Sequence, residues 1–524
     1  MILKYLLSLS IIFPLTDTYK ILVVNPKFGY SHVHFFSQVA DILVDAGHNV
    51  TVLTIEMDPS ITHPGSYKAN IIKYPTTKEI ADQFVNSIGP EIFWNLKNSI
   101  SSQLKMISKV MDAFFDMATI IFNDDKLTEV IRKEKYDVGI AEVLIPFFFG
   151  MFKVWKVKAS ISAVSYSTND KSYQDFGLDF PTSYMPSVFS SFSDKMTYVE
   201  RCQNMYIHLM ANYQFDVCEY KSSLQDEFDK KYGKEFFEKN KALGDTSFVI
   251  LNSNPFIDIP GQRTAKMVEV SGIGISEAKP LNDYWDKILS LRSKNILISF
   301  GTLAKGSFMP KNLKYGLLET IRRLKDITFI WKYETPKDGT GEGIENLILS
   351  KWLPQSDLLN DKRLTLFITH GGLGSTTETF FRGVPVIGIP ILADQLKNVK
   401  LFERHGIGII MDKEDLINSE ILDQNIKEVI DNEKYKRNAE VMAKMLKKRP
   451  MQPKELLIKH VEFAAEFGDL KMLDLASRNM GFIEYYNLDI IIPFFILLIS
   501  LFLFILYLLY KSFIRCFKVK IKTD

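Results

Sequence analysis

Cysteine is scarce in this chain of 524 residues, which contains three. No CxxC pair occurs, which excludes a zinc ribbon and a thioredoxin-like redox motif, and three residues are too few for a disulfide framework. Cys202 and Cys218 lie in one mixed polar segment. The sequence leaves open whether they form a disulfide or stay as free buried thiols.

An excess of charge of one sign is also lacking. The chain has 64 Lys and Arg residues against 62 Asp and Glu residues, a formal net charge of +2. This balance argues against a nucleic-acid binder, which needs a basic surface. Neither an acidic cluster with metal-ligand spacing nor a solenoid or heptad repeat is found. The length and the 46% hydrophobic content are enough for two or three domains with their own cores.

Both ends of the chain carry membrane-targeting patterns. Lys4 precedes an apolar run and then a polar stretch, which predicts a signal peptide over residues 1–17, with a buried first strand as the alternative. Residues 490–510 hold no charge and are long enough to cross a hydrocarbon core of roughly 30 Å, with a buried core helix as the alternative. The tail 511–524 is basic, and positive charge beside a span stays cytoplasmic. These patterns together predict a single-pass type I membrane protein.

The compartment follows from the last five residues. Residues 520–524 read KIKTD and resemble the KxKxx retrieval signal of endoplasmic-reticulum membrane proteins. A generic basic stop-transfer tail is the alternative. We therefore expect the endoplasmic-reticulum membrane, with the folded part in the lumen.

Between its ends the chain alternates strand and helix patterns twice. Residues 20–26 and 50–55 are apolar runs on either side of a helical pattern over 34–48, which is a βαβ unit and implies a parallel sheet. The second alternation begins at residue 295. We therefore predict an α/β protein with doubly wound domains over 18–272 and 294–480 and a linker over 273–293. Ligands of such sheets bind at the carboxyl ends of the strands, here in a cleft between the domains.

Two Phe- and Met-rich segments, 84–122 and 176–240, interrupt the first alternation. They predict helices and loops over the sheet edge that offer a pocket to an apolar ligand. For any single Phe or Met in them, core packing is the simpler explanation.

The most informative stretch is FITHGGLGSTTETFFRGVPVIGIPILADQ, residues 367–395. A buried strand is predicted to end at Thr369, a turn to follow at residues 370–372, and a helix to end near Gly383. Glycines let the backbone approach a ligand, and free N–H groups at a helix start attract an anion. The spacing fits neither a Walker loop nor the dinucleotide GxGxxG. Taken alone, HGGxG is equally consistent with a structural turn.

The whole stretch resembles the signature of the UDP-glycosyltransferases. Its anchors are Thr369, His370, Gly372, Glu378, Pro385, Pro390, Asp394 and Gln395. The resemblance extends to FGT at 300–302, to WLPQ at 352–355, and to the two ends, and it is strongest to the membrane-bound UDP-glucuronosyltransferases and their glucosyl-transferring counterparts. It implies a GT-B fold of two facing Rossmann-like domains plus one C-terminal transmembrane helix. It also implies inverting transfer of a hexose or hexuronic acid, from UDP-glucose or UDP-glucuronate, to hydroxyl groups of small lipophilic aglycones.

The resemblance assigns the UDP-sugar to the second domain. By position, Trp352 stacks on uracil and Gln355 hydrogen-bonds it. Glu378 binds the ribose hydroxyls. The remaining assignments are Thr302, His370 and Ser375 on the pyrophosphate, in the turn that holds Gly372 and Gly374, and Asp394 and Gln395 on the sugar. Many family members have Asn where this chain has Gly374, so that contact is lost or is taken over by Ser375. The family needs no metal, so we expect no cofactor.

The first domain is expected to supply the base. In FGYSHVH, residues 28–34, the family position selects His32, with His34 as its rival. Histidine titrates in the range useful for taking a proton from an alcohol. In YDVGIAEVL the position of the family's orienting Asp holds Glu142, while Asp137 is more simply a turn or capping residue.

Two other functions stay open on the sequence alone. One is a catalytically silent nucleotide-sugar-binding or scaffold protein, and the other is a UDP-sugar epimerase on the same fold. The donor is also open, because the position of the family's glucuronate-binding Arg falls on Gly261, with Arg263 two residues away. The aglycone, a homo-oligomeric state, and use of the sequon at Asn49 are not settled by the sequence.

Overall fold

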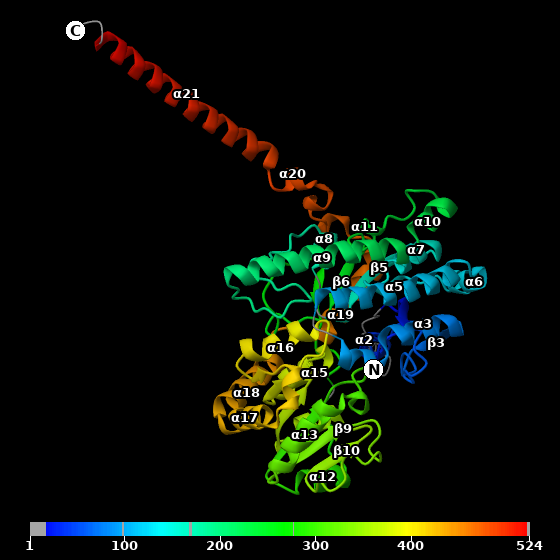
Figure 1. Cartoon of the computed structure of the whole chain (residues 1–524). Helices are drawn as coiled ribbons and strands as arrows, with labels where there is room; N and C mark the ends of the chain where they lie inside the picture. The colour runs from blue at the N-terminus through cyan, green and yellow to red at the C-terminus, as the bar shows by residue number, and fades with distance from the viewer. Residues whose placement is uncertain (1–16, 97–98, 167–169, 276, 521–524) are drawn as a thin grey trace, which may run out of the picture. The chain divides into compact units, whose positions relative to one another are not determined.

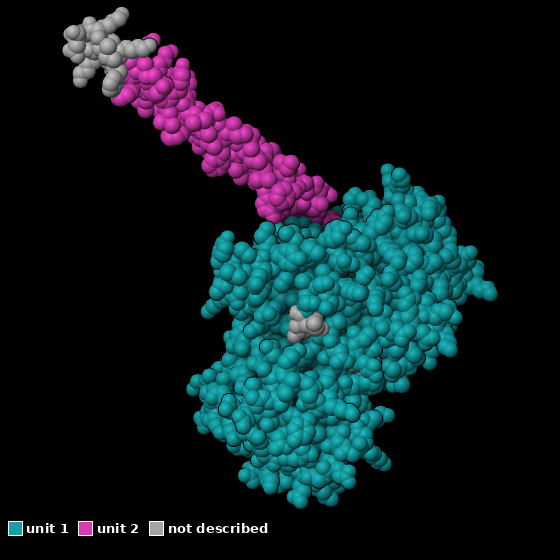
Figure 2. Space-filling model, in the orientation of Figure 1, with its two compact units in different colours: residues 1–473 teal, residues 474–524 magenta. Residues whose placement is uncertain are grey.

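A computed structural model describes residues 17–96, 99–166, 170–275 and 277–520. The predicted signal peptide, apart from Asp17, and residues 521–524 of the retrieval motif lie outside these ranges. The chain divides into two compact units, residues 1–473 and 474–524, each described by itself (Figure 2). We call the described residues 17–275 the N-lobe and residues 277–447 the C-lobe; both belong to the first unit.

The N-lobe is built on a seven-stranded sheet of parallel strands in the order β3-β2-β1-β4-β5-β6-β7. Its strands are β1 (Lys20–Pro26), β2 (Asn49–Glu56), β3 (Asn70–Pro75), β4 (Val138–Glu142), β5 (Ala159–Val164), β6 (Phe248–Leu251) and β7 (Met267–Glu269). Alternate residues of β1 face different cores, because Leu22 and Val24 belong to one cluster and Ile21 and Val23 to another. A parallel sheet covered on both faces explains why these strands read as continuous apolar runs.

The C-lobe is built on a six-stranded parallel sheet in the order β10-β9-β8-β11-β12-β13. Its strands are β8 (Lys294–Ser299), β9 (Ile327–Lys332), β10 (Leu347–Ser350), β11 (Leu364–Thr369), β12 (Val386–Gly388) and β13 (Gly408–Ile410). In both sheets the strand order reverses beside the first strand of the lobe. That reversal opens a crevice at the carboxyl ends of β1 with β4 and of β8 with β11.

Helices cover both faces of each sheet (Figure 1). The N-lobe helices are α2 (Tyr30–Asp45), α3 (Lys78–Ile88), α4 (Pro90–Asn95), α5 (Ile100–Phe122), α6 (Asp125–Glu134), α7 (Phe147–Val154), α8 (Lys171–Asp175), α9 (Tyr198–Ser222), α10 (Gln225–Tyr232) and α11 (Lys239–Ala242). The C-lobe helices are α12 (Asp283–Leu289), η1 (Gly306–Phe308), α13 (Lys311–Arg323), α14 (Gln355–Asn360), α15 (Leu373–Arg382), α16 (Gln395–Arg404), η2 (Lys413–Ile417), α17 (Ser419–Asp431) and α18 (Glu433–Lys447). The predicted linker therefore contains a helix, α12, whose Trp285 and Leu289 are buried in a C-lobe cluster.

One helix near the end of the first unit leaves the second sheet. Helix α19 (Pro453–Phe467) packs Leu457 and Val461 into the N-lobe cluster that holds Ile21 and Val23. The sequence places residues 294–480 in the second domain, but the apolar stripe of α19 fits a face of the first sheet that α2 leaves partly open. The short helix η3 (Lys471–Leu473) then ends this unit.

Contacts between the lobes fix them within the first unit. The indole N–H of Trp94, on α4, donates to the carbonyl of Lys305 at 2.9 Å. The ammonium of Lys413, from η2, donates to the carbonyl of Leu96 at 2.8 Å. Trp94 also packs into the main C-lobe cluster.

The second unit contains η4 (Ala476–Asn479), α20 (Phe482–Tyr485) and the long helix α21 (Leu488–Lys520). Within α21, Leu488–Arg515 has a mean hydropathy of 3.0, and none of its most apolar stretch is buried against the rest of the protein. By length and composition it can therefore cross a membrane. It contains the predicted span 490–510.

The two cysteines of the first unit are free. Both lie on α9, where Cys202 is exposed and Cys218 is buried. They occupy opposite sides of the helix, so the open alternative of a disulfide between them is excluded.

Candidate active site

His32 lies at the carboxyl end of β1, in the first turn of α2. The sequence predicts a loop here with the helix from residue 34, but α2 already begins at Tyr30. Gly29 caps the helix in an extended conformation, which lets the chain turn from strand to helix within a few residues. The side chain of His32 stays 19% exposed at this edge of the sheet.

Glu142 and Ser165 meet the imidazole of His32 from the two neighbouring strands. Glu142 is the last residue of β4, and its fully buried Oε2 lies 3.1 Å from His32 Nδ1. Ser165 follows β5; its hydroxyl donates to Glu142 Oε2 at 2.5 Å and its Oγ lies 2.6 Å from His32 Nδ1. The carboxylate has lost its water but keeps these hydrogen bonds, as a buried charge requires.

This arrangement selects one tautomer of His32. A carboxylate oxygen and a hydroxyl oxygen that already donates its proton both face Nδ1, so Nδ1 carries the ring proton. The Nε2 lone pair is then left to accept a proton from another molecule. His34 is held differently, since its Nε2 lies 2.6 Å from Gln38 Nε2 and its ring stacks on Tyr30.

Two aromatic rings lie beside the imidazole of His32. The ring of Phe28 lies 4.3 Å from the imidazole, centroid to centroid, and itself packs on Phe114 of α5 at 5.0 Å. The ring of Tyr166 lies 6.2 Å from the imidazole. The Phe-rich helix α5 therefore contributes to the wall beside His32, as the sequence predicts for that segment.

The glycine-rich turn of the C-lobe has the predicted form. β11 ends at Thr369, and Gly371 takes a φ of +78° at a point where a Cβ would lie 2.4 Å from Val399. Gly372 caps α15, which ends at Gly383 with a φ of +69°. The first N–H groups of α15 thus point out of the sheet edge, where the partial positive charge of a helix start favours an anion.

His370 is neutral in this turn. Burial, with a further contribution from the nearby Lys332 ammonium, lowers the pKa of His370 to about 4. The ring also approaches Gly301, where a Cβ would lie 2.6 Å from its Nε2. At physiological pH this ring can therefore offer a neutral donor but not a positive charge.

Lys332 is a polar residue of this region that the sequence analysis missed. It is the last residue of β9, and its ammonium donates to the carbonyl of Gly301 and lies 5.8 Å from the centroid of the Trp352 ring. A Lys that ends an apolar strand, ITFIWK, is the signal that could have identified it. It is a cation placed between two predicted contacts of the donor nucleotide.

Gln355, Ser375 and Glu378 form one hydrogen-bonded group. The Gln355 amide donates to Glu378 Oε2 at 2.5 Å and to Ser375 Oγ at 3.1 Å. Burial raises the pKa of the Glu378 carboxyl, and the Gln355 amide opposes that shift. The fold therefore brings these three predicted residues together. Trp352, three residues before Gln355, is 62% exposed.

Asp394 and Gln395 sit where α16 begins. The Gln395 side-chain oxygen accepts from the backbone N–H groups of Ile391 and Leu392 at 2.9 and 3.1 Å. Asn398 donates to Asp394 Oδ2 at 3.1 Å. Ala393, directly before Asp394, takes a φ of +56°, an uncommon conformation for a non-glycine residue.

A cavity of 390 Å³ lies between the lobes next to these groups. Thr302 and Trp352 line it from the C-lobe, and Tyr30, His63 and Tyr67 line it from the N-lobe. The rings of Tyr30 and Trp352 lie 6.0 Å apart, and Tyr30 is two residues from His32. The predicted nucleotide platform, Trp352, and the first residue of the helix that carries His32, Tyr30, therefore line the same cleft.

His63 is a second residue that the sequence analysis missed. Its Nδ1 accepts from the N–H of Gly65 at 3.0 Å, and burial lowers its pKa to about 4, so the proton of the neutral ring is on Nε2. Within the part of the chain that the structure describes, the buried Nε2 of His63 has no hydrogen-bond partner. A single His after a strand gives no sequence signal of this kind.

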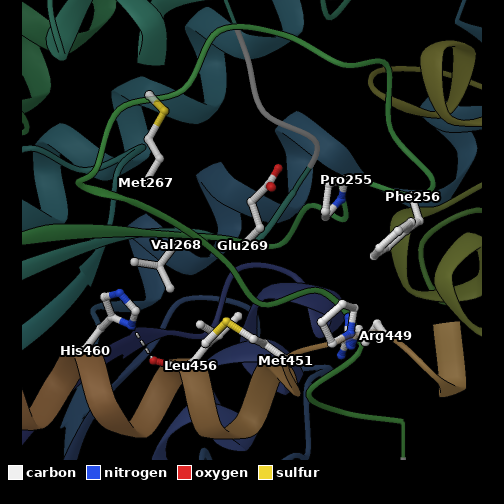
Figure 3. A pocket seen from close by; sticks show the side chains of 10 residues that line it. Pro255, Phe256, Met267, Val268, Glu269, Arg449, Met451, Leu456 and His460 are labelled. Carbon is white, nitrogen blue, oxygen red and sulfur yellow. Dashed lines mark hydrogen bonds between the residues drawn. The ribbon is translucent and has the colours of Figure 1, made fainter.

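Another cavity, of 300 Å³, holds none of the predicted site residues (Figure 3). It is lined by Phe256, Met267 and Glu269 of the N-lobe, by the segment around Arg449, and by Leu456 and His460 of α19. The cleft between the lobes is therefore the candidate site. Among the described residues, no group of three His, Cys, Asp or Glu side chains is arranged to hold a metal ion.

Comparisons with known proteins place this geometry in a family. A family profile described as "UDP-glucoronosyl and UDP-glucosyl transferase" matches residues 19–524. The putative UDP-glucuronosyltransferase ugt-46 of Caenorhabditis elegans is 28% identical and covers 92% of this chain and 92% of its own. The UDP-glycosyltransferase UGT5 of Dactylopius coccus is 29% identical over 97% of this chain and 94% of its own. The human UDP-glucuronosyltransferase 2B15 is 26% identical over 93% and 92%.

Two solved structures support the fold. The glycosyltransferase VinC, in complex with dTDP, has a TM-score of 0.55 at 15% identity and covers 86% of this chain and 100% of its own. The glycotransferase of kitacinnamycin has a TM-score of 0.54 at 17% identity over 86% and 98%. The predicted GT-B arrangement of two parallel Rossmann-like sheets is confirmed by these likenesses.

Proposed function

The chain belongs to the family of UDP-glucuronosyl and UDP-glucosyl transferases and is a UDP-sugar glycosyltransferase, and from this we propose that it transfers a hexose, with inversion, to a hydroxyl group of a small lipophilic alcohol. His32 is the proposed base. Its Nε2 takes the proton of the acceptor hydroxyl while that oxygen forms a bond to the anomeric carbon. The bond from this carbon to the diphosphate breaks on the opposite face, and UDP leaves.

A single observation supports this assignment above the others. Glu142 Oε2 and Ser165 Oγ lie 3.1 and 2.6 Å from Nδ1 of His32, which leaves the lone pair of Nε2 to act as the base. The Glu142 carboxylate stabilises the imidazolium that forms when Nε2 takes the proton. Ser165 acts as a positioning residue, because its hydroxyl ties the carboxylate and the ring into one geometry.

In the donor half of the site, each proposed contact matches the chemistry of a UDP-sugar. Trp352 offers an aromatic face to uracil, and Glu378 accepts from the ribose diol. Thr302, His370 and Ser375 and the start of α15 bind the diphosphate, with Lys332 as the nearby cation. Asp394 and Gln395 bind hydroxyls of the sugar.

For the donor sugar we propose a neutral hexose rather than a hexuronic acid. At Gly261, where the resemblance to the glucuronosyltransferases would put an Arg, a Cβ would lie 2.6 Å from Tyr173 Oη and 2.7 Å from Met185 Sδ. Arg263 is already bound, to Glu269 Oε1 at 3.1 Å and to the Tyr173 hydroxyl at 2.6 Å. Neither position leaves a guanidinium for a sugar carboxylate, which supports UDP-glucose over UDP-glucuronate.

The proposed acceptors are lipophilic, because the rings of Phe28 and Tyr166 lie beside the His32 imidazole and Phe114 packs on Phe28. The proposed location is the endoplasmic-reticulum membrane, with the lobes in the lumen and the basic tail in the cytoplasm. The apolar helix α21 and the sequence KIKTD support that location. Replacing Lys520 and Lys522 by Ser should then send the protein to the cell surface, whereas unchanged retention would contradict the retrieval role.

A UDP-release assay on the full chain tests the reaction. Membranes with the protein receive UDP-glucose or UDP-glucuronate and a panel of phenols and steroids, and UDP is measured with and without acceptor. We expect acceptor-dependent UDP release, with UDP-glucose preferred when both donors compete. Binding of UDP without acceptor-dependent release would instead identify a silent nucleotide-sugar binder. A preference for UDP-glucuronate would overturn only the donor assignment.

A further inference from the structure

Helix α9 exposes a continuous apolar face. Its members are Met205, Tyr206, Leu209, Met210, Tyr213 and Val217, each between 38% and 68% exposed. They recur at the spacing that places residues on one side of a helix. By contrast, α18 exposes only Val441 and Met445 among its large apolar residues. We call this set the α9 face.

Charge is absent along most of this side of the helix. From Cys202 to Phe215 the sequence CQNMYIHLMANYQF contains one ionisable residue besides cysteine and tyrosine, the buried His208, whose Nδ1 lies 2.9 Å from Asp170 Oδ2. Asp216, at the C-terminal end of the stripe, is paired with Lys171 at 2.9 Å. The α9 face therefore lacks the charged groups that usually keep an exposed helix surface in water.

Folding of the N-lobe does not depend on the α9 face. The opposite side of α9 buries Asn204, Ala211, Phe215 and Cys218 against the lobe, and α9 runs beside α5 (Figure 1). A capping box of Thr197 and Glu200 starts the helix independently of these contacts. Packing in the core therefore does not explain why the outer side of α9 is apolar.

The chain itself carries a segment that can tether it to a lipid bilayer. The chain holds a helix able to cross a membrane, and the segment 474–487 that precedes it extends at most about 50 Å. Tethering turns even a weak surface contact into an intramolecular one with a high effective concentration. Tyrosines flanking aliphatic residues are typical of helices that lie in the membrane interface.

The area of the α9 face is small for a protein partner. The stripe from Met205 to Val217 covers about 200 Å², taking 1.5 Å of rise per residue and a width of about 10 Å. A stable interface between two chains buries about 800 Å² on each partner. We infer that the α9 face lies on the surface of the bilayer that anchors the chain, with the helix in the plane of the interface.

The test uses a native thiol one helical turn before the N-terminal end of the stripe. Cys202 is exposed and lies on the same side of α9 as Tyr206 and Leu209, whereas Cys218 is buried. The full chain with Cys516→Ser, in phosphatidylcholine nanodiscs at one chain per disc, is labelled at Cys202 with a nitroxide. Electron paramagnetic resonance then compares relaxation by oxygen, which concentrates in lipid, with relaxation by a nickel chelate, which stays in water.

A matched label on another surface gives the reference. In a Cys202→Ser, Cys516→Ser background, Glu440→Cys places the nitroxide on α18, where the Glu440 side chain is 62% exposed. We expect oxygen to dominate at Cys202 and nickel to dominate at residue 440. Equal access of nickel to both labels would overturn the inference.

Two double variants of the α9 face test whether the bilayer, and not the surrounding protein, shields the label at Cys202 from nickel. Leu209→Glu with Tyr213→Glu should make the Cys202 label accessible to nickel without changing the circular dichroism spectrum, since both side chains are exposed. Leu209→Met with Tyr213→Phe should keep the label shielded. Shielding that persists in the Glu variant, or dipolar broadening between labels in detergent that reveals a second copy on the face, would contradict a bilayer as the occupant. None of these readings depends on the glycosyl transfer.

Discussion

The N-lobe and the C-lobe both place polar side chains at the carboxyl ends of parallel strands, but they hold these side chains in different ways. In the N-lobe, His32, Glu142 and Ser165 converge within 3.1 Å of one another. In the C-lobe, Gln355 donates a hydrogen bond to Glu378, but the ring of Trp352 is largely exposed to solvent. The difference fits the proposed roles, because a base works best in a geometry fixed before the substrate arrives, whereas a bound nucleotide can complete its own site.

The largest expected effect tests the N-lobe half of this comparison. His32→Ala should lower kcat by about 10³-fold, because the acceptor hydroxyl loses its base, while the dissociation constant of UDP stays unchanged. Steady-state UDP release gives kcat, and calorimetric titration with UDP gives the affinity. His34→Ala is the matched control on the same helix. If it caused the loss and His32→Ala did not, the roles of the two histidines would be reversed.

The next effect tests whether the N-lobe group acts as a unit. Glu142→Gln should lower kcat by about 10²-fold, since the amide no longer stabilises the imidazolium, and Ser165→Ala by about 10-fold. The double variant should lose less than the product of the two, because residues in one hydrogen-bond network are coupled. Ser165→Thr, which keeps the hydroxyl, should recover most of the activity. A strictly multiplicative double variant would show that Ser165 acts on its own.

In the C-lobe, replacing the exposed ring of Trp352 should weaken the binding of UDP without lowering kcat. Trp352→Ala should weaken UDP binding about 5–150-fold, because stacking of a base on an aromatic ring is worth about 1–3 kcal/mol. Trp352→Phe keeps an aromatic face and should lose less. Titration with UDP measures both. An unchanged affinity in the Ala variant would remove uracil from this surface.

Buried neutral histidines are a property that both lobes share. Burial holds the pKa of His63, in the N-lobe, and of His370, in the C-lobe, at about 4 against the ordinary value of 6.5. Between these values the unfolded chain binds more protons, so the stabilisation is complete above pH 6.5 and is lost as the pH falls toward 4. Wild-type Tm should therefore drop across this window. His63→Gln should show a smaller drop, and an identical drop would contradict a buried neutral ring.

The sequence predicts the C-lobe better than the N-lobe, for a physical reason. Its turn at Gly371, the start of α15 and the end at Gly383 depend on local backbone geometry, which glycine spacing encodes directly. Ser165 and His63 depend instead on which strands become neighbours, and crossovers far apart in sequence decide that order. The packing of α19 on the first sheet was not predicted for the same reason. An amphipathic stripe shows that a helix is partly buried, but not which sheet it packs against.

The smallest expected effect comes from adding a polar side chain to the donor turn of the C-lobe, so that more of its contacts exist before the nucleotide binds. A Cβ at Gly374 would have no atom within 4 Å, so Gly374→Asn adds a side chain beside the donor turn without a clash. One added hydrogen bond of about 0.5–1.5 kcal/mol should lower the KM for UDP-glucose about 2–12-fold and leave kcat unchanged. Gly372→Asn is the contrasting variant, because its Cβ would lie 2.6 Å from His370 Nε2 and should weaken UDP binding. A rise in KM for Gly374→Asn would show that Ser375 already occupies the contact that the glycine leaves open.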